Sequence, residues 1–160
     1  MTVASAVISD HSPVCYSGSD WSVAANALWE TDAGIVVVLD AEQHPIGIIS
    51  ERDICRTVAM RESLPETLKT ADVMWAPAPS CHPNEGVSAA LATMALNRIP
   101  ALPVLGPDGE MMGIVSIQRI LLGAAEDPAI APAQLLQVLR EVWARRQLPE
   151  AAVVCGWEHR

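Results

Sequence analysis

The feature that most constrains this chain is an internal repeat with a period of 66 residues. Sliding the 160-residue sequence against itself by that offset, without a gap, aligns residues 47–50 (GIIS) with residues 113–116 (GIVS). The same offset aligns further identical residues: Pro13 with Pro79, Cys15 with Cys81, Ser22 with Ser88, Ala24 with Ala90, Val38 with Val104 and Leu39 with Leu105. Chance produces two or three such matches but not a co-linear series, so we interpret the chain as a duplicated unit.

Both copies predict the same order of elements, β-α-β-β-α. For the first copy we expect a short strand near residues 14–15, a helix over 22–31, strands over 35–39 and 46–50, and a helix from 50 or 51 to about 60. For the second copy we expect a short strand at 81, a helix from 84 or 85 to 97, strands over 102–105 and 111–116, and a helix over 117–125. The sequence Pro107-Asp108-Gly109 indicates a turn between the last two strands.

The first helix of the first copy has its own capping and burial signals. Val23, Leu28 and the neighbouring alanines suit a single buried stripe, and either Asp20 or Ser22 can cap the helix start.

Two strands and two helices bury little surface alone, so we expect the copies to pack sheet to sheet around a pseudo-twofold axis. The predicted fold class is therefore mixed α/β (α+β). We predict three segments: residues 1–62 and 63–127 for the two repeats, and 128–160 for a terminal helix and tail.

The terminal helix is predicted over residues 133–146. Leu135, Leu139 and Val142 recur at i, i+4 and i+7, with Leu136 and Trp143 beside them. We expect this stripe to pack on the repeats or on a sister subunit. A docking helix for a separate effector protein is the alternative.

Composition narrows the class of protein. Hydrophobic residues make up 51% of the chain and charged residues 18%, which is typical of a folded protein. The net charge of −9 opposes a nucleic-acid partner. The apolar run Ile35–Leu39 is much shorter than a membrane-spanning helix, and the N-terminal residues do not resemble a signal peptide. We therefore expect a cytoplasmic protein without a membrane partner.

The four cysteines are scattered along the chain. Cys15, Cys55, Cys81 and Cys155 form no C-x-x-C pair and have no histidine at zinc-site spacing, so we expect no metal site. The favoured interpretation is reduced, buried thiols; a redox pair is the alternative.

The repeated block carries a family resemblance. The sequence VVVLDAEQHPIGIISERDI at residues 36–54, with LPVLGPDGEMMGIVSIQRIL at residues 102–121, resembles the CBS (cystathionine β-synthase) domain, which occurs in pairs as the Bateman module. The resemblance covers roughly residues 8–125. It implies a regulatory module that binds an adenosyl ligand, whereas the period alone indicates only a duplicated α/β unit.

The stretch Gly47-Ile48-Ile49-Ser50-Glu51-Arg52-Asp53 is similar to the ligand motif of that family. Glycine lets a backbone approach closely, and Ser50 with the free N–H groups of a helix start can hold a phosphate oxygen. The Asp53 carboxylate can accept hydrogen bonds from both hydroxyls of a ribose. The alternative is structural: Ser50 as an N-cap and Asp53 as a first-turn acid favoured by the helix dipole.

The second copy departs from this motif because Arg119 stands where the acid should be. A guanidinium has no acceptor and cannot bind a ribose diol. A second site built from Val14, Cys15, Ser116 and Arg119 is therefore the weaker candidate. Arg119 is expected in a surface or intersubunit salt bridge, with a phosphate or a partner's carboxylate as the alternative.

The resemblance further implies that each cleft is built from both repeats. Ser50 and Asp53 would then face Pro79-Ser80-Cys81 and Arg98-Ile99-Pro100-Ala101. Ile99 and Ala101 would supply an apolar slot or backbone groups for an adenine, and Arg98 would reach phosphates or cap helix carbonyls. AMP, ADP, ATP or S-adenosylmethionine is the expected ligand, with Mg²⁺ only alongside ATP.

The sequence thus favours a non-enzymatic sensor that dimerises with itself and signals to an unidentified effector protein. No catalytic motif such as G-x-S-x-G or H-E-x-x-H occurs. The alternative is a ligand-free structural module that acts through its exposed faces and its terminal helix.

Overall fold

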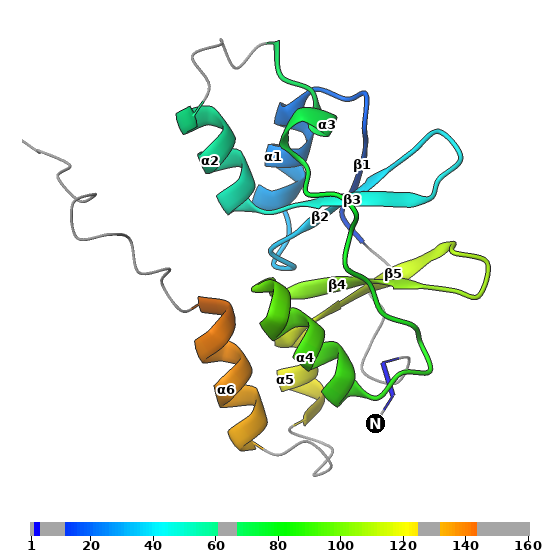
Figure 1. The fold of residues 1–160 in the computed structure, drawn as a ribbon, viewed down its shortest axis with the longest axis vertical. Helices are drawn as coiled ribbons and strands as arrows, with labels where there is room; N and C mark the ends of the chain where they lie inside the picture. Colours follow the sequence, from blue (N-terminus) through cyan, green and yellow to red (C-terminus); the bar gives the residue numbers. More distant parts are fainter. Residues whose placement is uncertain (1, 4–11, 61–66, 125–131, 144–160) are drawn as a thin grey trace, which may run out of the picture.

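The computed structural model describes residues 2–3, 12–60, 67–124 and 132–143. Two β-hairpins stack over each other, and helices cover their outer sides (Figure 1). The strands are β1 Val14–Tyr16, β2 Val36–Leu39, β3 Pro45–Ile49, β4 Ala101–Leu105 and β5 Met111–Ser116. The helices are α1 Trp21–Trp29, α2 Glu51–Met60, α3 Thr70–Val73, α4 Val87–Asn97, α5 Ile117–Ala124 and α6 Pro132–Trp143.

The two hairpins are built in the same register. In the antiparallel pair β2–β3, Val38 lies opposite Gly47, and in β4–β5, Val104 lies opposite Gly113. Both pairs also shift register directly after these positions, at Leu39 and at Leu105. Because every pairing is displaced by the 66-residue offset, the duplication and the mixed α/β fold class are confirmed.

The short first strand of each copy pairs in parallel with the strand after the helix. Cys15 in β1 pairs with Val38, and Cys81 makes an isolated parallel bridge with Val104. The prediction of an extended piece at both positions is correct.

Alternate residues of the first hairpin enter two different cores. Val36, Val38 and Ile49 pack beneath α1 with Ala24 and Leu28. The intervening side chains join a larger core that contains residues of both repeats: Ile35, Val37, Leu39 and Ile48 from the first, with Leu102, Val104, Ile114 and Val115 among those from the second. Because strand side chains alternate between faces, one hairpin binds its own helices on one side and the other repeat on the other. The predicted sheet-to-sheet packing is therefore correct.

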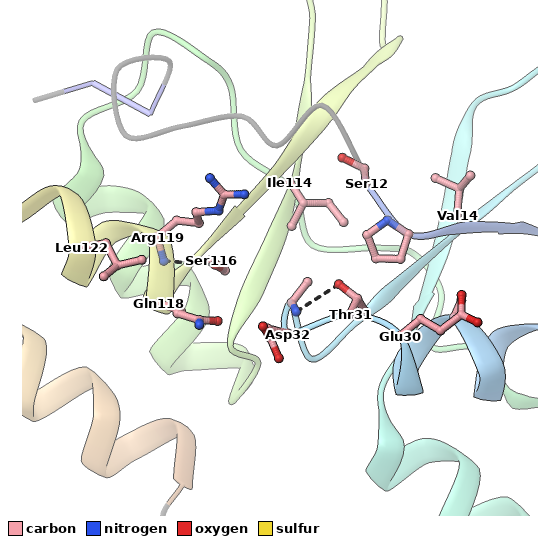
Figure 2. A pocket seen from close by; sticks show the side chains of 13 residues that line it. Ser12, Val14, Glu30, Thr31, Asp32, Ile114, Ser116, Gln118, Arg119 and Leu122 are labelled. Carbon is pink, nitrogen blue, oxygen red and sulfur yellow. Dashed lines mark hydrogen bonds between the residues drawn. The ribbon is translucent and has the colours of Figure 1, made fainter.

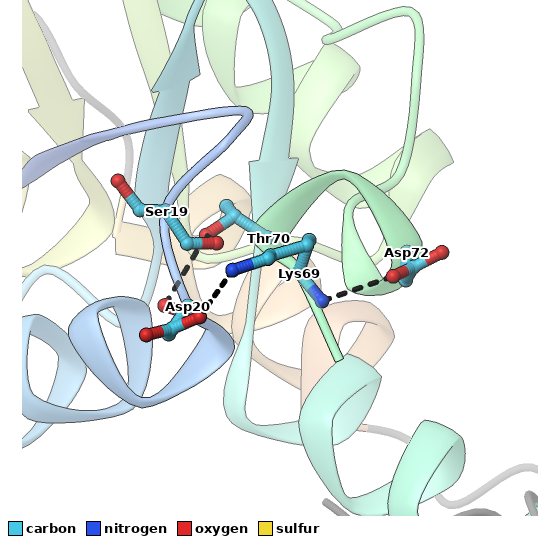
Figure 3. A network of polar contacts seen from close by, with 5 residues as sticks. All are labelled: Ser19, Asp20, Lys69, Thr70 and Asp72. Atoms are coloured by element: carbon cyan, nitrogen blue, oxygen red, sulfur yellow. Dashed lines mark hydrogen bonds and ion pairs between the residues drawn. The ribbon is translucent and has the colours of Figure 1, made fainter. Parts of the chain in front are cut away.

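The segment that leads into the second repeat packs on the first repeat. Thr70 is fully buried, and both its N–H and its hydroxyl donate to the carbonyl oxygen of Ser19, at 2.8 and 2.9 Å. Lys69 Nζ lies 2.6 Å from Asp20 Oδ1 (Figure 3). The N–H of Lys69 also donates to the Asp72 carboxylate at 2.9 Å. Neither α3 nor this arrangement was predicted.

The residues before the first repeat show the reciprocal arrangement. Thr2 bridges to Gly86, which lies 66 residues after Asp20, and the N–H of Val3 donates to the Glu85 carbonyl at 2.9 Å. Val3 is fully buried in the larger core. Each repeat is therefore completed by the segment that precedes the other repeat.

Helix α1 corrects two sequence-based expectations. Ala24 and Leu28 are buried, but Val23 is 45% exposed. At 100° per residue, Val23 lies about 140° around the helix from Leu28, so the two cannot share a narrow stripe. Asp20 is the N-cap residue, but its side chain makes no capping bond because it binds Lys69.

The other helices agree with the predictions except at their edges. Helix α4 begins at Val87 rather than at Asn84 or Glu85, with Gly86 as its N-cap. Helix α6 buries Leu135 and Val142 as expected, with Val138 as the third fully packed position. Its residues Leu136 and Trp143 are exposed, and the predicted extension to residue 146 lies outside the described residues.

Helix α6 packs within the chain. Its buried residues belong to the larger core, together with Leu91 and Met94 of α4. The expectation that this helix packs on the repeats is confirmed. In the described part of the chain, no helix is both long and apolar enough to cross a bilayer.

Candidate functional site

The junction between β3 and α2 carries the Ser50–Asp53 pair. We call residues 50–56 the Asp53 junction. Asp53 Oδ2 accepts hydrogen bonds from the Ser50 hydroxyl at 2.6 Å and from the Ser50 backbone N–H at 2.9 Å. The Asp53 N–H in turn donates to Ser50 Oγ at 3.4 Å, and this reciprocal pattern is a capping box, the structural alternative for these residues. One carboxylate oxygen is thus engaged in holding the helix start, and both residues remain partly exposed.

Gly47 of the motif allows another segment of the same chain to approach its backbone closely. A Cβ at this position would lie 2.8 Å from Met74 Sδ and 3.1 Å from the Trp75 carbonyl oxygen. Ile48 and Trp75 exchange backbone hydrogen bonds beside it. The glycine therefore admits the connecting segment between the repeats, and a direct contact with a ligand stays a prediction.

The residues predicted to face Asp53 from the second repeat divide into buried and accessible groups. Cys81, Ile99 and Ala101 are buried in the larger core, so their side chains are not presented to a ligand. Pro79, Ser80 and Pro100 are half-buried, and Arg52 and Arg98 are exposed. The backbone of Cys81 is also engaged, since its N–H donates to the Pro103 carbonyl and its carbonyl accepts from the Leu105 N–H, so the adenine slot stays a prediction.

Arg98 ends helix α4 in a left-handed conformation, with φ 54° and ψ 45°. Its N–H donates to the carbonyl oxygens of Ala95 and Met94, so the backbone closes the helix. In the same region, Pro100 lies against Gly34, where a Cβ would meet the proline Cγ at 2.8 Å. The two loops that follow α1 and α4 therefore touch each other.

The equivalent junction in the second repeat has only part of this hydrogen-bond pattern. The N–H of Arg119 donates to Ser116 Oγ at 3.2 Å, which is half of the capping pattern of the first repeat. The other half is missing because a guanidinium cannot accept a hydrogen bond. In the described part of the chain, the Arg119 side chain has no ion-pair partner within 4 Å.

A cavity of about 750 Å³ lies beside Arg119; we call it the Arg119 cavity (Figure 2). One wall comes from β5 and α5, and the opposite wall comes from the start of β1 and the loop after α1 (Figure 2). The lining residues are Ser12, Pro13, Val14, Ala27, Glu30, Thr31, Asp32, Ala33, Ile114, Ser116, Gln118, Arg119 and Leu122. The cavity is thus built from both repeats.

Three members of the weaker predicted site, Val14, Ser116 and Arg119, line this cavity together, whereas Cys15 is buried in the core under α1 and does not line it. Sequence reasoning missed Glu30, Asp32 and the residues around them. A signal was present for Asp32 and Ala33, which correspond by the repeat offset to Arg98 and Ile99 of the predicted first site, whereas Glu30 corresponds to Leu96, which was not assigned.

The described cysteines are free and differ in exposure. Burial raises the pKa of the Cys15 thiol to about 11, against the smaller effect of a hydrogen bond with Thr70. Burial also raises the pKa of Cys81 to about 12, and the negative charge of Glu85 adds to this effect. Cys55 is exposed, so the prediction of buried thiols is wrong for this residue. In the described part of the chain, no group of three or more metal-ligating side chains is assembled.

These differences predict selective alkylation. At pH 8, iodoacetamide is expected to modify Cys55 at least about a hundredfold faster than Cys15 or Cys81, since only a thiolate reacts and raised pKa values keep the buried thiols protonated. Peptide mass spectrometry over time measures the three rates. Raising the pH toward 11 should accelerate Cys15 before Cys81. In urea the three rates should become similar, and equal rates at pH 8 in the native protein would contradict the burial described here.

Comparison with known proteins gives a consistent result. A family model described as the CBS domain matches residues 4–60 and 71–126. An uncharacterized protein of Methanopyrus kandleri is 33% identical over 92 residues, covering 58% of this chain and 47% of that relative. The chain spans about half the length of the first curated relatives that it matches.

Solved structures share the fold at low sequence identity. The CBS domain protein TA0289 of Thermoplasma acidophilum has a TM-score of 0.75 at 20% identity, over 88% of this chain and 75% of that one. The protein PAE2072 of Pyrobaculum aerophilum, complexed with AMP, has a TM-score of 0.66 at 22% identity, over 79% and 99%. The CBS domain pair of MJ0100, in complex with 5′-methylthioadenosine and S-adenosyl-L-methionine, has a TM-score of 0.66 at 23% identity, over 78% and 98%.

Proposed function

Because the chain belongs to the CBS domain family, with a match in each of its repeats, we propose that it is a regulatory module that binds an adenosyl ligand. The candidates are AMP, ADP, ATP and S-adenosylmethionine, bound between the repeats. The occupied state is passed to a partner protein in the cytoplasm, and the module acts as a homodimer without catalysing a reaction. Two structural neighbours bind ligands of this class, which supports the proposal.

The observation that carries the proposal is the acid at the start of α2 in the first repeat. Asp53 uses Oδ2 to cap the helix, and in the described residues no hydrogen bond occupies Oδ1. Its carboxylate lies in the first turn of a ten-residue helix, where free backbone N–H groups favour an anionic ligand group nearby. We propose that Asp53 accepts the ribose hydroxyls and that Ser50 and Arg98 contact the phosphate side.

Thermal unfolding with each of the four ligands tests this function. A ligand that binds only the folded chain is expected to stabilise it by about 2.7 kcal/mol at a concentration 100 times its Kd. At least one of the four should therefore raise the Tm at millimolar concentration. No rise with any of them would refute ligand sensing and leave the structural module as the remaining function.

The variant Asp53→Asn is expected to lose most of the ligand-dependent rise in Tm, because an amide is a poorer acceptor for two hydroxyls. Asp72→Asn is a matched control, since Asp72 also accepts a backbone N–H at a helix start, from Lys69 at 2.9 Å. Each variant should lose about 0.3–1 kcal/mol of stability, because a negative charge is removed from the first turn of a helix. An Asp53→Asn protein that responds to ligand like the parent would remove Asp53 from the site.

A further inference from the structure

The residues that line the Arg119 cavity differ in charge from the residues at the equivalent positions of the first site, 66 residues away in the sequence. The repeat offset converts each cavity residue into its counterpart in the other half of the molecule. The counterparts are Arg119 and Asp53, Asp32 and Arg98, Glu30 and Leu96, Gln118 and Arg52, and Leu122 and Arg56. Arg119 and Asp32 thus occupy the positions that Asp53 and Arg98 occupy in the first site, with the signs reversed.

This exchange gives the two places opposite charge. The Arg119 cavity is lined by two carboxylates, Glu30 and Asp32, and by one guanidinium, Arg119. The Asp53 junction carries two carboxylates, Glu51 and Asp53, and the guanidinium groups of Arg52 and Arg56, and the repeat offset adds Arg98, which gives three positive charges against two negative ones. The first place therefore favours an anionic ligand such as a nucleotide phosphate, and the cavity disfavours one.

The charges of the cavity are available to a ligand. Glu30, Asp32 and Arg119 are exposed, and in the described part of the chain none of them has a salt-bridge partner within 4 Å. Figure 2 shows Arg119 on the α5 wall and Glu30 on the opposite wall, with Asp32 at the loop between them. Val14, Ile114 and Leu122 add apolar lining, and about 750 Å³ is enough for a small organic molecule.

From this pattern we infer that the Arg119 cavity binds a small organic ligand with two cationic groups and one carboxylate, and that it rejects phosphorylated nucleotides. The carboxylate pairs with Arg119, and the cationic groups pair with Glu30 and Asp32. The inference rests on the proposed function in that it divides the adenosyl ligands between the two places by charge. It does not require a ribose diol to bind at Arg119.

A series of four probes separates the contributions of the charges. S-adenosylmethionine carries a sulfonium, an ammonium and a carboxylate, and S-adenosylhomocysteine lacks the S-methyl group and with it the sulfonium charge. The analogue 5′-methylthioadenosine lacks the amino acid group as well, and AMP is anionic. By calorimetric titration, we expect S-adenosylmethionine to bind the cavity about tenfold or more tightly than S-adenosylhomocysteine, and binding to weaken as salt is added.

Isosteric variants assign each probe to its place. Asp32→Asn and Glu30→Gln are each expected to weaken S-adenosylmethionine binding about tenfold and to leave the Kd for AMP within about twofold. Arg98→Gln is the matched control at the position equivalent to Asp32, and it should weaken AMP without affecting S-adenosylmethionine. All three side chains are exposed, so the unliganded Tm should stay close to that of the parent.

The outcomes separate the two proposals. An Asp32→Asn, Glu30→Gln double variant that binds S-adenosylmethionine like the parent overturns the charge assignment, as does a parent that binds AMP but not S-adenosylmethionine. Both results leave a nucleotide sensor in place. A parent that binds none of the four probes overturns the proposed function, and the assignment of the cavity with it.

Discussion

Replacing Leu91 by alanine is expected to destabilise the protein by about 2–5 kcal/mol. Leu91 lies on α4, is fully buried, and belongs to the larger core that contains residues of both hairpins and of α6. Truncating it removes transfer free energy and leaves a cavity that three packed elements cannot easily fill. Urea denaturation followed by circular dichroism measures the loss.

Leu96→Ala is the matched control because it makes the same change in the same helix. Leu96 is 84% exposed, so its removal should change the free energy of unfolding by no more than about 0.5 kcal/mol. Similar losses for the two variants would mean that α4 presents a different face to the core.

Introducing a carboxylate at Val138 is expected to cost about 3–5 kcal/mol, or to detach α6 from the repeats, because an unpaired charge would be buried. Val138 is 5% exposed and packs in the larger core. Leu136→Asp, two residues earlier on the same helix, should be tolerated because Leu136 is 62% exposed.

Hydrogen exchange of α4 distinguishes the two ways in which Val138→Asp can act. If α6 detaches, amide protection along Val87–Asn97 should fall while the first repeat keeps its protection. A Val138→Asp protein as stable as Leu136→Asp would show that α6 contributes nothing to the core.

Much of the fold follows from local patterns in the sequence. The β-branched run before Leu39 and the Pro107-Asp108-Gly109 turn predict the hairpins, and the same offset relates both registers. Strand Met111–Ser116 and helix Glu51–Met60 agree with their predicted bounds. These elements are predictable because the period of hydrophobic side chains and the residues of a turn depend only on neighbouring positions in the sequence.

Two segments each precede one repeat and pack on the other: residues 2–3 and residues 69–71. These crossed leading segments were not predictable in the same way. Thr70 is buried because it bonds to Ser19, a partner about fifty residues away, and no local period marks such a pairing. Asp20 illustrates the same limit, since its local signal is a helix cap and a distant lysine takes its carboxylate instead.

The candidate site was only partly accessible from sequence. Arg119 was identified because it replaces the acid of the ligand motif in the second repeat. Its cavity is also lined by Glu30 and Asp32, which belong to no recognisable motif. Applying the repeat offset to Arg98 of the predicted first site finds Asp32, but Glu30 corresponds to Leu96, which the sequence did not mark. Which face each side chain occupies, and hence the exchange of charges, required the structure.

The crossed leading segments also determine when each half of the chain can close during synthesis. The carbonyl groups of Ser17 and Ser19, near the start of the first repeat, lack these backbone donors until Thr70 and Ala71 leave the ribosome. Val3 waits longer, for the carbonyl of Glu85. The first repeat can therefore complete these bonds only after residue 71 has emerged, and Val3 can bond only after residue 85 has emerged, so both closures wait for the synthesis of the second repeat to begin.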